Sequence, residues 1–131
     1  MTRRWCLALD LHDDPDAIAE YCRYHERVWP EIEESIRSAG IVGMEIWRTG
    51  NRLTMVMETD ERFNPAAKAA ADAANPRVQA WEALMSRFQQ PLPWAKPGEK
   101  WTLMEKVFTL TNADLPPSET DRRLSPPLSQ G

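Results

Sequence analysis

The chain is organised around residues 21–31, which read YCRYHERVWPE. Tyr21, His25 and Trp29 stand four residues apart, so on a helix they would share one face. Pro30 interrupts that helix, because proline lacks an N–H and pushes the preceding residue toward extended geometry. The pattern predicts a helix that ends just past His25 and a second, short helix with Pro30 at its first position. His25 then lies at a helix C-terminus, where the helix dipole favours the protonated imidazole.

The rest of the chain is predicted from apolar spacing and turn residues. Apolar runs and alternation predict four strands, at residues 4–11, 41–47, 53–58 and 101–110. Helical spacing predicts a first helix from Asp14-Pro15, a second up to Gly40, and a third from Pro76 to about Gln89. Within residues 41–47, Met44 and Ile46 share one face of the strand, and Glu45 and Trp47 share the other. Residues 60–75 are rich in alanine, and the sequence does not decide whether they form a lid.

The order β-α-β-β-α-β places the chain in the α+β class. It is that of the split ferredoxin-like unit, an antiparallel sheet with both helices on one face. The uncovered face needs a partner, and a homodimer that pairs two sheets, as in a dimeric α+β barrel, is the simplest one. We expect this domain to take residues 1–111. Residues 112–131 gather proline, serine and charge, which predicts a disordered or extended tail.

Composition excludes several classes of function. The 131 residues carry a formal charge of −4, and no basic patch points to nucleic acid. No apolar run approaches the ~20 residues that span a bilayer, and the N-terminus does not read as a signal peptide. Two unpatterned cysteines predict reduced thiols and a cytoplasmic address. With two histidines and no Cys/His cluster, a zinc site is not expected, although carboxylates could still hold a metal.

The string Tyr21-x3-His25-x3-Trp29-Pro30 resembles the L-rhamnose mutarotase family, and the order of elements over residues 3–110 is similar. The resemblance implies a dimeric α+β barrel and an isomerase that interconverts the α and β anomers of a free 6-deoxy-sugar. It implies no cofactor and no metal. By position it implies His25 as proton donor, Tyr21 as a sugar contact and Trp81 as one of a pair of tryptophans that touch the sugar.

Two positions depart from the family pattern. Ala80 stands where the first tryptophan of the pair is expected, and Met44 stands where a strand tyrosine touches the sugar. Both changes alter the pocket wall. The run GMEIWR at 43–48 resembles relatives associated with L-fucose. The resemblance therefore implies L-fucose as the favoured substrate, with L-rhamnose second.

Mutarotation needs a proton on the ring oxygen and the loss of one from the anomeric hydroxyl. A histidine can give and take a proton near neutrality. The base is left open among Tyr21, Glu45, Glu105 and a water molecule. A tryptophan can cover the apolar face of a sugar, although Trp29 before a proline is more simply a packing wedge. The predicted catalytic residues are His25 and Tyr21, and the predicted substrate-binding residues are Trp29, Met44, Glu45, Trp47, Trp81 and Glu105.

Two other functions fit the same fold. One is a cofactor-independent monooxygenase, which would use an apolar pocket for an aromatic substrate, and six tryptophans allow that. The other is a non-catalytic dimer that binds a small molecule. The fold cannot separate these, because one architecture hosts unrelated activities. The preferred ligand and the effect of replacing His25 would distinguish these functions from the mutarotase.

Overall fold

The computed structural model describes residues 1–111, and the predicted tail at 112–131 lies outside the described residues. The elements in chain order are β1 (Arg3–Leu11), α1 (Pro15–Tyr24), α2 (Pro30–Ser38), β2 (Ile41–Thr49), β3 (Arg52–Thr59), α3 (Pro65–Ala73), α4 (Pro76–Ser86), β4 (Gln89–Gln90) and β5 (Thr102–Leu103). The predicted α+β class and β-α-β-β-α-β order are confirmed, with each helical connection made of two helices.

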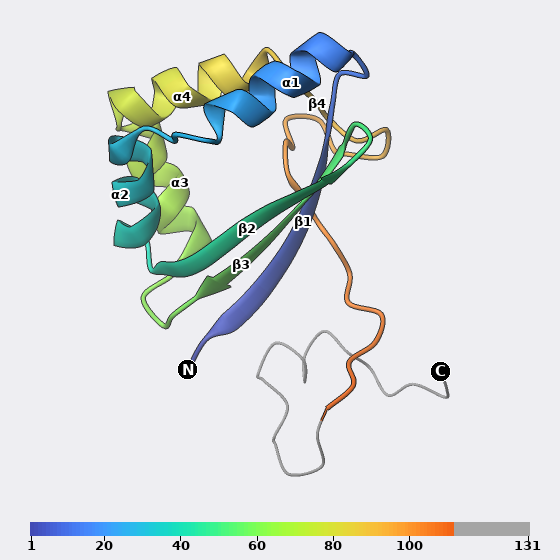
Figure 1. Ribbon diagram of the computed structural model, residues 1–131. Helices are drawn as coiled ribbons and strands as arrows, with labels where there is room; N and C mark the ends of the chain where they lie inside the picture. Colours follow the sequence, from blue (N-terminus) through green and yellow to red (C-terminus); the bar gives the residue numbers. More distant parts are fainter. Residues whose placement is uncertain (112–131) are drawn as a thin grey trace.

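The strands form one antiparallel sheet in the order β2-β3-β1-β4, and β5 also pairs with β1. All four helices lie on one side of this sheet, as Figure 1 shows. Leu9, Leu11 and Leu53 point from the sheet toward the helices and are fully buried. Tyr21, Trp81 and other helical residues complete the core beside them. None of the described helices has the length and apolar character needed to cross a membrane.

Proline and short polar caps decide where the helices begin. Every helix has proline in its first turn, and Asp14, Asn64 and Asn75 cap three of them by accepting backbone N–H bonds. The break between α1 and α2 falls as the sequence predicted, with α2 beginning at Pro30. Gly40 ends the second helix with a φ of 94°, in the left-handed region predicted for it.

The end of the domain differs from the prediction. The strand expected over residues 101–110 pairs with β1 only at Thr102–Leu103, and the Met104 N–H still donates to the Cys6 carbonyl. Beyond that bond, residues 105–110 leave the sheet (Figure 1). The helix expected to reach Gln89 ends at Ser86, because the next residues turn inward and Gln89–Gln90 pair with β1 as β4.

Candidate functional site

A pocket of about 320 Å³ lies between the sheet and the helices. This volume suits a small molecule. Its sheet wall is apolar and consists of Leu7, Met44, Ile46, Met55 and Met57. Its helix wall carries polar side chains, among them Tyr21, His25, Lys68, Asp72 and Glu82, and Gln89 of β4 and Lys100 of the following loop add to them. The pocket therefore offers one apolar wall and one wall of hydrogen-bonding groups.

His25 caps the C-terminus of α1 and lines this pocket. Its Nδ1 lies 2.8 Å from the carbonyl oxygen of Tyr21. A carbonyl only accepts, so Nδ1 carries the hydrogen, and in the neutral ring Nε2 keeps a free lone pair. Burial lowers the pKa of His25 below its usual 6.5, and the hydrogen bond to Tyr21 opposes this with a smaller effect. The net shift of the His25 pKa is therefore opposite to the one predicted from the helix dipole alone, because burial has the largest effect.

Tyr21 packs beneath the imidazole. The centres of the two rings are 4.3 Å apart, and the tyrosine is only 3% exposed. Burial raises the pKa of Tyr21 to about 12, while a hydrogen bond from Gln89 acts in the opposite direction. The phenol therefore keeps its proton at every physiological pH and can donate a hydrogen bond into the pocket.

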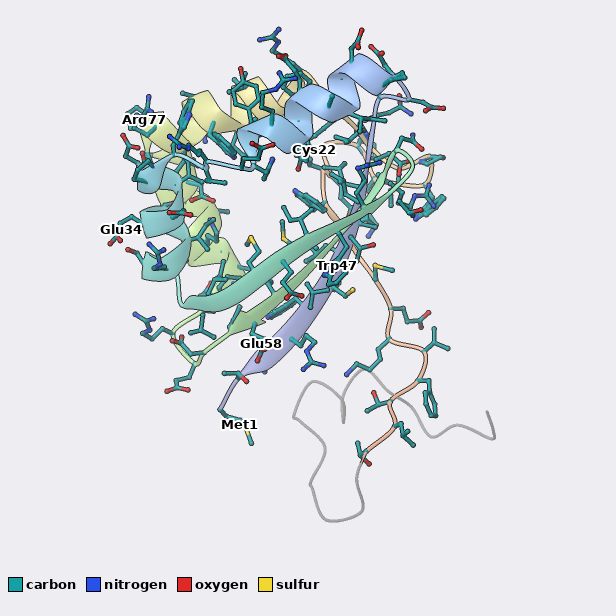
Figure 2. All side chains as sticks on the ribbon, in the orientation of Figure 1. Met1, Cys22, Glu34, Trp47, Glu58 and Arg77 are labelled. Carbon is teal, nitrogen blue, oxygen red and sulfur yellow. The ribbon has the colours of Figure 1, made fainter. Side chains whose placement is uncertain are left out.

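Trp81 lines the pocket, whereas Trp29 lies behind it. The Trp81 ring meets His25 edge-on at 5.6 Å and Trp29 at 5.1 Å. Trp29 is held in turn by the Arg77 guanidinium, 4.1 Å above its ring. Figure 2 shows Arg77 at the start of α4, where that helix meets α2. In this chain Trp29 is a packing residue between α2 and α4 and does not line the pocket.

The other predicted sugar contacts are divided between the two faces of the sheet. Met44 faces the helices and lines the pocket. Trp47 points to the opposite face (Figure 2). Its indole donates to Glu45, two residues before it on the same face, at 3.1 Å. Glu105 is exposed on the segment that leaves the sheet. Glu45 and Trp47 therefore lie outside the pocket of this chain, because alternate residues of a strand face opposite sides. Glu105 lies outside it because its segment has left the sheet.

The pocket also contains polar residues that the sequence did not predict. Lys68 and Asp72 of α3 form an ion pair at 2.6 Å, and Lys100 bonds Glu82 at 3.1 Å. Gln89 is buried, and its Oε1 has no hydrogen-bond partner among the described residues. One signal was available, since Lys68 and Asp72 are the only charges in the alanine-rich residues 65–73 and stand four apart. Among residues 1–111, no group of three or more His, Cys, Asp or Glu could hold a metal ion.

Comparisons with known proteins point to one family. The sequence model of the L-rhamnose mutarotase family matches residues 4–110. An L-fucose mutarotase of Xanthomonas campestris pv. campestris is 53% identical over 113 residues, which cover 85% of this chain and 90% of that protein. An L-rhamnose mutarotase of Yersinia pestis is 39% identical over 61 residues, which cover 44% of this chain and 59% of that protein.

Two solved structures share the fold. The L-rhamnose mutarotase of Formosa agariphila superposes with a TM-score of 0.62 at 19% identity, covering 83% of this chain and 99% of that one. The tetracenomycin F2 cyclase of Streptomyces glaucescens, a type II polyketide cyclase, gives a TM-score of 0.50 at 16% identity, covering 85% and 98%. At these identities the two likenesses show the architecture alone. The family match over nearly the whole described chain and the 53% identical relative are decisive: this chain belongs to the L-rhamnose mutarotase family.

Proposed function

We propose that this protein is a mutarotase that interconverts the α and β anomers of free L-fucose, with L-rhamnose as the second substrate. The observation that carries the proposal is a neutral imidazole, His25, with Nδ1 fixed by a backbone carbonyl and Nε2 free in a pocket of small-molecule size. The choice of L-fucose is supported by the 53% identical relative.

The two walls of the pocket fit a neutral 6-deoxy-sugar. The apolar sheet wall, with Met44, Met55 and Met57, suits the C6 methyl group. The charges on the helix wall come as two pairs, Lys68 with Asp72 and Lys100 with Glu82. Each pair is neutral as a whole, so the wall suits an uncharged polyol better than a carboxylate or a phosphate.

In the ring-opening step, Nε2 of His25 takes the proton of the anomeric hydroxyl while the C1–O1 bond becomes a carbonyl and the C1–O5 bond breaks. O5 takes a proton at the same time. Tyr21 is our candidate donor, since its phenol is more acidic than the alcohol that forms; a water is the alternative. After rotation about C1–C2, the protons return by the reverse transfers. The sequence predicted His25 as the proton donor and left the base open; in this proposal His25 accepts the proton in the opening half and donates it in the closing half. Glu45 and Glu105, two of the candidate bases, lie outside the pocket and are not the base here.

Saturation-transfer NMR on the anomeric protons tests the proposal. We expect the protein to accelerate exchange for L-fucose more than for L-rhamnose. His25→Ala should reduce this acceleration by about 10²- to 10⁴-fold, the usual contribution of general acid–base catalysis. Cys22→Ala is the control, because Cys22 is an exposed residue of the same helix and should leave the rate unchanged. No acceleration for either sugar would contradict the proposal, and tight binding of a phenol or quinone would favour the monooxygenase instead.

We also propose that two copies form a homodimer through the sheet face that the helices leave uncovered. Trp47 on that face is 63% exposed. The segment after β5 adds Val107 and Phe108, exposed by 74% and 57%. Side chains this apolar are usually covered in a stable protein, and a second copy offers the same sheet face.

A cytoplasmic address is proposed on the state of the cysteines. Cys6 is half-buried on β1, Cys22 is exposed on α1, and both are free thiols. An exposed thiol persists most readily in a reducing compartment. Alkylation of both thiols in freshly lysed cells would support this address, and an oxidised Cys22 would speak against it.

A further inference from the structure

Helix α3 brings one charged pair into the pocket. Lys68 and Asp72 stand one turn apart, with Nζ and Oδ2 2.6 Å from each other. Their side chains are only 22% and 24% exposed, and both line the same pocket as His25. Figure 1 shows α3 on the same side of the sheet as the other helices. Helix α3 is therefore part of the pocket wall, and both of its charged side chains line the pocket.

The pair does little for the fold. Both residues belong to one helix, so their bond joins no two elements, and such a pair adds only slightly to the stability of its own helix. Removing two charges from most of their water is costly, and that cost offsets the attraction between them. No other side chain among residues 1–111 bonds to the Lys68 ammonium or the Asp72 carboxylate. The Lys68 ammonium thus has hydrogens left to donate into the pocket, and the Asp72 carboxylate has oxygen lone pairs left to accept.

We infer that Lys68 and Asp72 bind two neighbouring hydroxyl groups of the sugar, those at C3 and C4. This inference rests on the proposed function, because it takes C1 to be held at His25. Lys68 and Asp72, on a different part of the pocket wall, would then meet the side of the sugar ring opposite C1. The ammonium has hydrogens left to donate, and the second carboxylate oxygen is free to accept, so the pair matches two adjacent hydroxyls.

The inferred contact also bears on selectivity between the two sugars. In L-fucose the hydroxyls at C3 and C4 are cis, whereas in L-rhamnose they are trans. A donor and an acceptor that are fixed 2.6 Å apart on one helix can engage two cis hydroxyls together. O4 is axial in L-fucose and equatorial in L-rhamnose, so a pair placed to bond O3 and O4 of L-fucose should lose its bond to O4 of L-rhamnose. The pair would then be a determinant of L-fucose preference that acts at a distance from the reacting atoms.

The experiment compares Lys68→Met and Asp72→Asn with the wild type in the anomeric exchange assay. We expect the KM for L-fucose to rise by about 10- to 100-fold, the effect of losing a hydrogen bond to a charged group. The kcat should stay within a few fold, because neither residue touches the reacting atoms. The matched control is Arg23→Met, which breaks the exposed pair with Glu20 on α1. It should change neither constant.

A deoxy analogue makes the test independent of the variants. In the wild type, 4-deoxy-L-fucose should show the same rise in KM, and Asp72→Asn or Lys68→Met should then add much less to it than they do with L-fucose. If the wild type does not act on L-fucose, the proposed function fails. If the wild type acts on L-fucose but both variants keep its KM, only this inference is wrong. If circular dichroism shows that a variant is unfolded, the wild type with deoxy sugars still tests the inference. If removing the C3 or C4 hydroxyl of L-fucose leaves the wild-type KM unchanged, the inference is wrong.

Discussion

At the scale of single residues, the protonation state of His25 follows from its two nearest surroundings. The Tyr21 carbonyl holds Nδ1–H, and the walls of the pocket remove water from the ring. The first effect favours the charged form and the second, larger effect disfavours it. A helix C-terminus alone would have suggested the opposite. The imidazole is therefore ready to accept a proton at neutral pH, which is what the first half of mutarotation requires.

The pH profile should show this directly. Because the pKa of His25 is lowered from 6.5, the ring stays neutral to a lower pH than a free histidine does. We expect the fall in kcat/KM for L-fucose at low pH to have its midpoint below 6.5, with a loss of about tenfold per pH unit once His25 is protonated. Exchange rates measured across pH 4.5–8, corrected for the uncatalysed reaction, check this. A midpoint above 6.5 would contradict the assignment.

Gly40 carries a second residue-scale prediction. Its φ is 94°, and an added Cβ would lie 2.7 Å from Oδ1 of Asp60 and 2.9 Å from the backbone nitrogen of Phe63. Gly40→Ala should therefore lower the free energy of unfolding by about 1–3 kcal/mol, through strain and crowding together. Gly43→Ala is the control, because nothing lies within 4 Å of its added Cβ. Urea unfolding of the two variants measures the difference, and equal losses would refute the explanation.

At the scale of elements, the sequence predicted most boundaries because proline, asparagine and glycine act locally. Pro30 and Gly40 delimit α2 as expected. Two features were not predicted, the side of α3 that faces the pocket and the length of the last strand, because both depend on residues distant in the sequence. Alanine spacing allows a helix at α3 but does not show which side meets the pocket. The apolar alternation of residues 101–110 suits a strand, yet only Thr102–Leu103 find a partner on β1.

The cap of α4 is testable at this scale. The Asn75 side chain accepts from the backbone N–H groups of Arg77, at 3.0 Å, and Val78, at 3.4 Å. Asn75→Ala should cost about 1 kcal/mol of folding free energy, whereas Asn75→Asp should restore most of it. Because α4 also carries Trp81, thermal unfolding should be followed by both circular dichroism and tryptophan fluorescence. An alanine variant as stable as the wild type would show that the cap contributes nothing.

At the scale of the whole molecule, the site was only partly predictable. The motif placed Tyr21 and His25, and the strand alternation placed Met44 apart from Glu45 and Trp47. The sequence did not predict which face of the sheet carries the pocket, because the pocket lies on the side that the helices cover. Lys68 and Asp72 come from α3 and Gln89 from β4, and no local pattern joins them to His25.

Assembly is the last property that depends on the whole molecule. If two copies pair through the uncovered sheet face, light scattering after size exclusion should give twice the chain mass of 15.1 kDa. Val107→Asp with Phe108→Asp should yield monomers, because burying two carboxylates in an apolar interface is costly. Ala66→Asp with Ala67→Asp places the same two charges on the exposed surface of α3, and should leave the dimer intact. A monomeric wild type at micromolar concentration would rule out a stable dimer, and Val107, Phe108 and Trp47 would then remain exposed to water without an apolar neighbour to cover them.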